Sequence, residues 1–134
     1  MFLVLDDNLR RLEWFRAAVA KHSHGRITTW TNAPQMLNDL EALLPEAELI
    51  SLDHDLYRQR PADPDPGSGR DVANFLARRE PCCPVIVHST NSDAAWGMYN
   101  ALSGAGWQTE LVHHLDQAEW VETLWWPKVV GMRG

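Results

Sequence analysis

The sequence has 134 residues, which is enough for one hydrophobic core and too few for two, so we expect a single domain over residues 1–134. Hydrophobic residues make up 45% of the chain and charged residues 22%, a balance that is typical of a globular protein and excludes a disordered or fibrous one. The formal net charge of −6 argues against extended duplex nucleic acid as a partner, but leaves a small phosphate ester or a nucleic-acid end open.

Three features of the sequence bear on the compartment. Residues 1–5 run directly into Asp6 and Asp7, which is unlike the start of a signal peptide. No apolar stretch approaches the roughly 20 residues of a membrane span. The two cysteines, Cys82 and Cys83, are adjacent, and adjacent cysteines rarely meet disulfide geometry. We therefore expect a cytoplasmic protein with no membrane partner.

The first half of the chain reads as two strand–helix units and a third strand. Residues 2–5 form an apolar run that is typical of a buried strand. From Asn8 onward apolar residues recur at helical spacing, so a helix is expected as far as residues 23–25. We then expect a strand over residues 26–30, a helix from Pro34 that Pro45 closes, and a strand over residues 48–52.

The second half begins with residues 57–69, where prolines and glycines are too frequent for a regular element. This long loop is either a lid or a permissive surface loop. A helix is then expected over residues 70–79, a strand over residues 84–87, and a helix from residue 92 or 93 to residues 104–106. A fifth strand over residues 107–112 precedes a last helix over residues 116–126, which Pro127 is expected to stop.

Five strands that alternate with five helices predict an α/β fold with a parallel sheet covered by helices on both faces. Functional groups in such sheets gather at the carboxyl ends of the strands, near the point where the strand order reverses. Four of the five predicted strand ends are followed by Asp, His, Ser, Thr or Asn. This pattern predicts a polar site at that edge of the sheet.

Acidic residues follow the first and third strands. Asp6 and Asp7 end the first, and Asp53, His54 and Asp55 end the third. If these two strands are neighbours, Asp6, Asp7 and Asp53 converge, and their mutual repulsion favours a divalent cation such as Mg²⁺, Mn²⁺ or Ca²⁺. A histidine ligand would widen the choice toward zinc or iron. The alternative is that the acids cap a helix and end a strand in solvent.

Polar residues also follow the fourth and fifth strands. His88 interrupts an apolar run where that strand should reach the site, and it either faces the site or is a hydrogen-bonded core histidine. Ser89, Thr90 and Asn91 come next and suit either a phosphate oxygen or helix capping. After the fifth strand, His113 and His114 should point to opposite faces, so at most one looks into the site.

The acidic pair, the aspartate that ends the third strand and the run Pro84-Val85-Ile86-Val87-His88-Ser89 resemble the receiver domains of response regulators. This resemblance implies a flavodoxin-like sheet in the order 2-1-3-4-5, Mg²⁺ at the acids, a phosphoryl group on Asp53 and Ser89 at the phosphate. Receivers use a lysine after the fifth strand, but His113 or His114 occupies that position here, and Lys128 lies beyond the last helix.

A closer resemblance is to the cyclic-phosphate processing receiver domain. The matching motifs are Leu52-Asp53-His54-Asp55-Leu56, Gly69-x-Asp71 at a helix start, and His88-Ser89-x-Asn91 followed by Met98. Tyr57 stands where a glycine often follows the first motif. The resemblance implies a site for cyclic nucleotides or for cyclic phosphate ends of nucleic acids.

Together these observations predict a metal-dependent phosphoesterase that opens cyclic phosphates. Its expected metal ligands for Mg²⁺ or Mn²⁺ are Asp6, Asp7, Asp53 and Asp55. The expected catalytic residues are Asp53, His54, His88 and His114, and the expected substrate-binding residues are Ser89, Thr90, Asn91 and His113. The alternative is a non-enzymatic signalling or nucleotide-binding module, in which Asp53 accepts a phosphoryl group.

Overall fold

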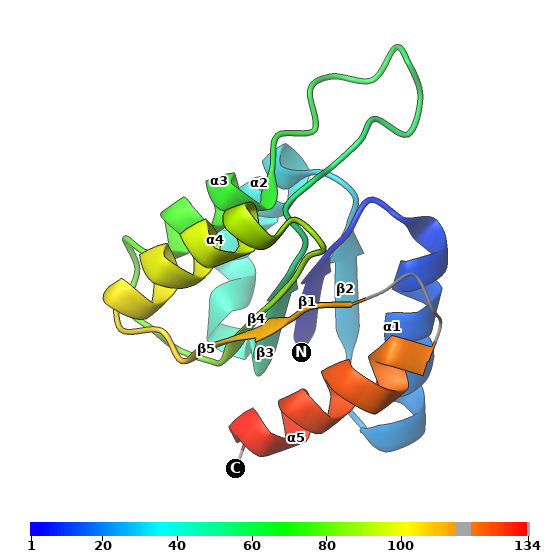
Figure 1. Cartoon of the computed structure of the whole chain (residues 1–134), viewed down its shortest axis with the longest axis vertical. Coiled ribbons are helices and arrows are strands. Elements are labelled where there is room, and N and C mark those ends of the chain that lie inside the picture. The colour runs from blue at the N-terminus through cyan, green and yellow to red at the C-terminus, as the bar shows by residue number, and fades with distance from the viewer. Residues whose placement is uncertain (115–118, 134) are drawn as a thin grey trace.

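The computed structural model describes residues 1–114 and 119–133. Its strands form one parallel sheet in the order β2-β1-β3-β4-β5 (Figure 1). The strands are β1 (Phe2–Leu5), β2 (Ile27–Trp30), β3 (Leu49–Leu52), β4 (Val85–His88) and β5 (Thr109–Val112). The predicted fold class and strand order are confirmed, and each predicted strand boundary lies within two residues of the observed one.

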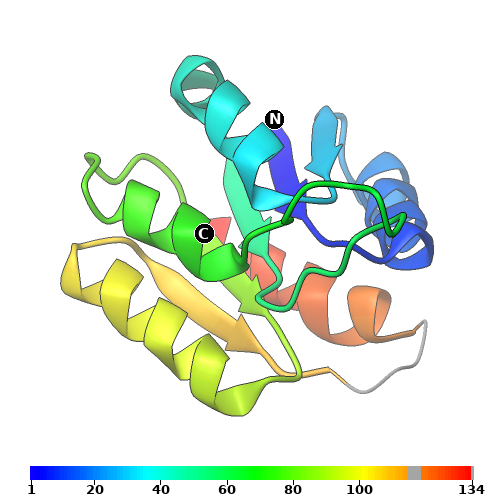
Figure 2. The ribbon, with the colours of Figure 1, turned by 90° about the horizontal axis from the view of Figure 1, so that it is seen from above.

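The helices are α1 (Leu9–His22), α2 (Ala33–Leu43), α3 (Gly69–Leu76), α4 (Ser92–Gly104) and α5 (Trp126–Arg133), with a 3₁₀ turn at Leu44–Glu46 and a π-helical turn at Val121–Trp125. They cover both faces of the sheet (Figure 2). The three central strands β1, β3 and β4 are buried along their whole length, because a parallel sheet between two helical layers buries both of its faces.

The two faces of the sheet have separate cores. Leu3, Leu5 and the residues level with them on β3 and β4 pack against α2, α3 and α4. Phe2, Val4 and their neighbours on the other face pack against α1 and α5 with Phe15 and Trp125. Since adjacent strand residues point to opposite faces, consecutive side chains at a strand end belong to different layers. This alternation decides which of the polar residues at the strand ends can reach the site.

The prediction that Pro127 stops the last helix is wrong. Helical structure runs from Val121 through Pro127 to Arg133. A proline lacks the N–H that an α-helix needs at that position, but the preceding turn is wide, and the Trp126 N–H donates to the carbonyl of Val121 five residues earlier. The helix therefore changes its hydrogen-bond register before it reaches the proline. Residues 116–118 of the predicted helix lie outside the described residues.

The segment between β3 and α3 extends beyond the carboxyl edge of the sheet (Figure 1). It is fixed at its far end, where the N–H of Gly69 donates to the carbonyl of His54 at 3.0 Å and Asp55 forms an antiparallel bridge with Ser68. Asp71 accepts a hydrogen bond from the N–H of Ser68 at 3.0 Å and so caps α3. Among the described residues, no helix combines the length and apolar character that a membrane crossing requires.

Gly69 is required by close packing rather than by its backbone angles. A Cβ atom at this position would overlap the backbone carbonyl of Asp53. We predict that Gly69→Ala lowers the free energy of unfolding by at least about 2 kcal/mol, because backbone atoms cannot move aside as a flexible side chain can. Chemical denaturation measures the change. The control is Gly104→Ala, since a Cβ at Gly104 meets no atom within 4 Å. Equal stability of the two variants would contradict the packing argument.

Candidate functional site

Three carboxylates meet at the carboxyl ends of β1 and β3. Asp6, Asp7 and Asp53 each offer an oxygen, and these oxygens lie within 4.8 Å of one another. Asp6 and Asp53 are buried, and Asp7 is partly exposed. This is the convergence that the strand order predicts for adjacent strands. The arrangement concentrates negative charge in a poorly hydrated place and therefore requires compensation.

The compensation comes from Arg11, which lies in the first turns of α1. Its Nε donates to Asp6 Oδ2 at 2.9 Å, and its Nη2 donates to Asp6 Oδ1 at 2.9 Å, so the pair is bidentate. Nη2 also lies 3.3 Å from Asp53 Oδ2 and 3.6 Å from Asp7 Oδ1. Arg11 is not among the site residues predicted from the sequence. Its place in the first turn of the helix that follows the acidic pair is the signal that could have identified it, because helical side chains lean back toward the N-terminus and so toward Asp6 and Asp7.

The pKa values of the three carboxyls show that the positive groups stabilise the charge of Asp6 much more than that of Asp53 or Asp7. Burial alone would raise the pKa of Asp6, but the hydrogen bonds and the electrostatic attraction of His88 and Arg11 lower it to about 2. Burial raises the pKa of Asp53 to about 8, and the negative charges of Asp6 and Asp7 add to the shift. Burial also raises the pKa of Asp7. Asp53 is therefore the carboxyl that gains most from an added positive charge.

His88 lies behind the acids rather than in front of them. Its ring is fully buried, Nε2 lies 3.0 Å from Asp6 Oδ2, and Nδ1 lies 2.6 Å from Ser51 Oγ. The indole N–H of Trp125 donates to Ser51 Oγ at 2.9 Å. Both ring nitrogens of His88 are therefore engaged, one by Asp6 and the other by Ser51. His88 thus orients Asp6, and its supports Ser51 and Trp125 are not among the site residues predicted from the sequence.

His54 and Asp55 form a second polar group on the site's outer side. Asp55 Oδ1 lies 2.7 Å from His54 Nδ1, and both Asp55 oxygens lie 3.4 Å from Asn91 Nδ2. The His54 side chain is 23% exposed. Asp55 was predicted as a fourth metal ligand, but it is not one of the three clustered carboxylates. Its carboxylate contacts His54 and Asn91 instead.

Of the three residues that follow β4, one caps a helix, one supports the backbone and one lines the site. Asn91 Oδ1 accepts from the N–H of Ala94 at 3.2 Å and so caps α4, as the capping interpretation expects. Ser89 is buried, and its Oγ accepts from the N–H of Asn91 at 3.1 Å. Thr90 is exposed and lines a hollow of about 420 Å³ above the carboxylates. The other lining residues are Asp7, Asn8, Arg11, Asp53, Asp55, Tyr57, Arg58 and Gln59.

His113 and His114 separate as predicted. His113 is exposed, whereas His114 is buried and its ring stacks on Trp120 with a centroid distance of 4.0 Å. The His114 and His88 rings lie 6.4 Å apart in the same layer, between the sheet and the helices α1 and α5. Neither histidine lines the hollow above the carboxylates.

The loop after β3 is tied to the acids at its near end. The N–H of Tyr57 donates to Asp7 Oδ2 at 2.9 Å, and the side-chain amide of Gln59 donates to the Asp7 carbonyl at 2.6 Å. At its far end, the Pro66 carbonyl accepts from the N–H of Ala33 at 2.8 Å. The loop therefore forms one wall of the site and spans from α1 to the start of α2 (Figure 2).

A comparison with models of protein families matches residues 1–104 to the family described as the cyclic-phosphate processing receiver domain. A comparison with curated proteins finds no match. The matched segment contains Asp6, Asp7, Asp53 and His88, and it ends at the last residue of α4.

Solved structures share the fold at low sequence identity. A response regulator receiver domain from Rhodospirillum rubrum has a TM-score of 0.71 at 15% identity, with 98% of this chain and 93% of that chain covered. The signal receiver domain of a putative LuxO repressor protein from Vibrio parahaemolyticus has a TM-score of 0.67 at 17% identity, with 98% and 91% covered. The response regulator DrrB from Thermotoga maritima has a TM-score of 0.60 at 22% identity, with 91% and 48% covered, so this chain spans about half of it.

The raised pKa of Asp53 makes stability depend on pH. Between the ordinary value of 3.8 and about 8, the folded chain keeps the Asp53 proton while the unfolded chain loses it, so stability falls as the pH rises through this window. An asparagine side chain has no such proton to lose. We predict that Asp53→Asn raises Tm relative to the parent chain by at least about 5 °C more at pH 8.5 than at pH 5, which corresponds to roughly 1–2 kcal/mol in a domain of this size.

Thermal unfolding in EDTA at several pH values measures this difference. The matched control is Asp39→Asn, because Asp39 is exposed and lies on α2 away from the acids. An asparagine there can still accept the hydrogen bond that the Trp30 indole donates to Asp39. A difference in Tm between Asp53→Asn and the parent chain that stays constant from pH 5 to pH 8.5 would show that Asp53 does not keep its proton in the folded state.

Proposed function

This chain belongs to the family of cyclic-phosphate processing receiver domains, and from that premise we propose that it is a metal-dependent phosphoesterase that opens cyclic phosphates of nucleotides or of nucleic-acid ends. The observation that carries the proposal is the cluster of Asp6, Asp7 and Asp53, of which Asp7 and Asp53 line an open hollow and Asp6 is buried behind them. Three carboxylates beside a phosphoester would repel it, so the arrangement is useful for phosphate chemistry only with an added cation.

The donor set fits Mg²⁺ or Mn²⁺, which prefer carboxylate oxygens. Asp6, Asp7 and Asp53 would hold the ion, and the raised pKa of Asp53 supports a shortage of positive charge at this place. Arg11 is bidentate on Asp6, but its contacts with Asp53 and Asp7 are longer, at 3.3 and 3.6 Å. When bound, the ion would neutralise charge on the non-bridging phosphate oxygens. Arg11 and His88 would keep the Asp6 carboxylate in place.

Ring opening needs two proton transfers. A water molecule loses a proton as its oxygen bonds to phosphorus, and the ribose oxygen gains a proton as its bond to phosphorus breaks. His54 does not line the hollow itself, but it lies between Asp53 and Asp55, which do. We assign one of these roles to His54, since Asp55 holds its Nδ1 and its Nε2 makes no hydrogen bond in the described part of the chain. Asp53 is the candidate for the other, as a base or as a nucleophile.

The remaining predicted residues take indirect roles in this proposal. His88 is a positioning residue, because both of its ring nitrogens are engaged and its ring is fully buried. His114 supports the same buried layer through its stacking on Trp120. Thr90 lines the hollow and is the proposed contact for a phosphate oxygen, while Ser89 and Asn91 shape the backbone that presents it. A substrate contact for His113 stays a prediction.

A second candidate function is a receiver-like module in which Asp53 accepts a phosphoryl group. The receiver fold and the position of Asp53 in the hollow favour it. The residues at the end of β5 do not, because His113 and His114 stand where receivers have a lysine. Lys128 lies on α5 and pairs with Glu110 at 3.8 Å. We therefore rank this function below the phosphoesterase.

A hydrolysis screen tests the proposed activity. We predict that the purified protein opens at least one 2′,3′- or 3′,5′-cyclic nucleotide or an RNA with a 2′,3′-cyclic phosphate end, in Mg²⁺ or Mn²⁺ but not in EDTA. His54→Gln should lower turnover by about 10²- to 10⁴-fold, the usual contribution of a positioned proton donor or acceptor. His24→Gln is the control, since His24 is exposed and precedes β2 at the opposite edge of the sheet. Absence of hydrolysis of every cyclic phosphate in both metals would refute the proposal.

Treatment with a small phosphodonor separates the two candidate functions. We predict that incubation with acetyl phosphate and Mg²⁺ leaves no long-lived phosphorylated form, because the site lacks the lysine that receivers use at the phosphate. Intact-mass measurement detects the added phosphoryl group. A stable mass gain in the parent chain that is lost in Asp53→Asn would instead favour the signalling module.

A further inference from the structure

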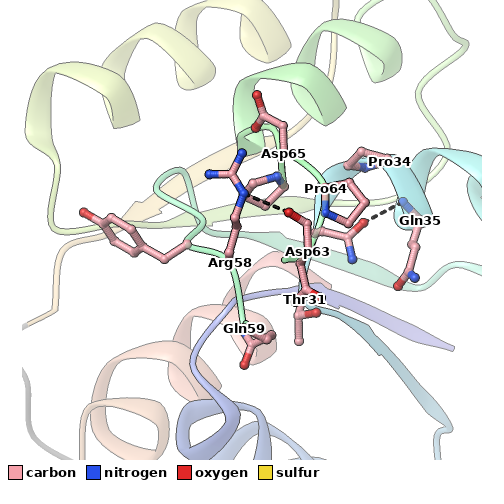
Figure 3. Close-up of a pocket in the computed structure, with 11 residues that line it drawn as sticks. Thr31, Pro34, Gln35, Arg58, Gln59, Asp63, Pro64 and Asp65 are labelled. Carbon is pink, nitrogen blue, oxygen red and sulfur yellow. Dashed lines mark hydrogen bonds between the residues drawn. The ribbon is translucent and has the colours of Figure 1, made fainter. Parts of the chain in front are cut away.

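A second cavity lies beside the hollow and has no role in the chemistry above. It has a volume of about 310 Å³ and lies between the loop after β3 and the turn that joins β2 to α2 (Figure 3). Its lining residues are Thr31, Asn32, Pro34, Gln35, Tyr57, Arg58, Gln59, Asp63, Pro64, Asp65 and Pro66. Tyr57, Arg58 and Gln59 also line the hollow above the carboxylates, so the two spaces are neighbours across these residues.

The walls of this cavity are held by hydrogen bonds. Arg58 Nε donates to the Asp63 carbonyl at 2.9 Å, which closes the loop on itself (Figure 3). Asn32 Oδ1 accepts from the N–H of Gln35 at 2.9 Å and fixes the turn on the other side. The hydrogen bond from the N–H of Ala33 to the Pro66 carbonyl joins the two walls. The cavity is therefore formed before a ligand arrives, which lowers the entropic cost of binding.

The chemistry of the lining favours a flat, neutral, polar-edged ring. Pro34, Pro64 and Pro66 offer rigid apolar surfaces, and Figure 3 shows Pro34 and Gln35 on one side of the space and Arg58 on the other. Within the described residues, the Gln35 side-chain amide makes no protein hydrogen bond, so it is available to the edge of a heteroaromatic ring.

Charge excludes a second phosphate from this cavity. Asp63 and Asp65 bring two negative charges to the lining, and Arg58 brings the positive one. The balance is net negative, so an anionic group is repelled, whereas a neutral ring with amino groups is not. The cavity therefore prefers a neutral ligand, whereas the carboxylate cluster with a bound cation would prefer an anionic phosphate.

We propose that this cavity is a subsite for the nucleobase of a nucleoside cyclic phosphate whose phosphate lies at the carboxylate cluster. The proposal rests on the proposed function for the position of the phosphate, but the base-binding chemistry is a property of the cavity alone. Free cyclic nucleotides and the terminal nucleotide of an RNA share this chemistry. Residues 57–59 separate the two subsites. The hydrogen bonds from Tyr57 and Gln59 to Asp7 fix the position of this wall of the cavity relative to the carboxylates.

The test uses nucleosides that carry no phosphate. Adenosine, guanosine, cytidine and uridine are titrated to roughly 10 mM, which detects a Kd in the millimolar range, and backbone amide shifts are followed by NMR. At least one nucleoside should shift residues 31–35 and 57–66 in a saturable way. Gln35→Trp should weaken this binding at least about tenfold by filling the cavity mouth. Asn38→Trp is the matched control, since Asn38 is exposed on α2 but does not line the cavity.

The outcomes separate the subsite from the activity. Saturable shifts in the cavity without any hydrolysis would support the subsite and refute the phosphoesterase. Hydrolysis of a cyclic phosphate, with no nucleoside causing shifts in the cavity, would overturn the subsite and keep the phosphoesterase. The same conclusion would follow if kcat/KM were equal for a nucleoside cyclic phosphate and for a ribose cyclic phosphate that lacks a base. If the subsite is correct, Gln35→Trp lowers kcat/KM for the nucleoside cyclic phosphate. The same substitution leaves kcat/KM for the base-free ribose cyclic phosphate unchanged. Comparison of a free cyclic nucleotide with a cyclic-phosphate-ended RNA then identifies the source of the base.

Discussion

The repulsion among three carboxylates at one sheet edge is the constraint on which the site depends. Asp6, Asp7 and Asp53 lie within a few ångströms of each other where water is scarce, so each must share a positive group or keep its proton. Arg11 and His88 stabilise the charge on Asp6, and Asp53 is left with a raised pKa. The positive groups of the protein are therefore concentrated on Asp6, and Asp53 is the carboxyl that keeps its proton to a higher pH.

This constraint connects elements that are far apart in the sequence. The hydrogen-bonded row from Trp125 through Ser51 and His88 to Asp6 begins at the π-helical turn and ends at the carboxylates. Trp125 is held at this depth although Pro127 follows two residues later, because the wide turn keeps the chain helical through the proline. The packing of the last helix against the sheet thus bears on the orientation of one carboxylate. Such buried networks are most useful when every group in them is satisfied.

The loop after β3 turns a receiver-like edge into a site with two compartments. Asp7 takes part in the carboxylate cluster and also accepts hydrogen bonds from Tyr57 and Gln59, so the same residue belongs to the cluster and anchors the loop. Gly69 allows the far end of the loop to approach the backbone of Asp53. A receiver fold by itself does not define a substrate, since one fold hosts many functions. In this chain, the features that argue for a substrate lie in the loop and in the cavity beneath it.

The sequence by itself determined the fold class and the order of elements, because these follow from local periodicity. The resemblance to receiver domains supplied the strand order 2-1-3-4-5, and with it the convergence of Asp6, Asp7 and Asp53 at the ends of neighbouring strands. Only the tertiary structure decided the roles of Arg11, Ser51 and the histidines. Arg11 looks like one of several surface arginines until α1 is placed beside β3. A histidine at a strand end can enter a hollow or a buried layer, depending on the face of the sheet to which it points and on the helix that covers that face. This is decided by packing between segments that are distant in the chain.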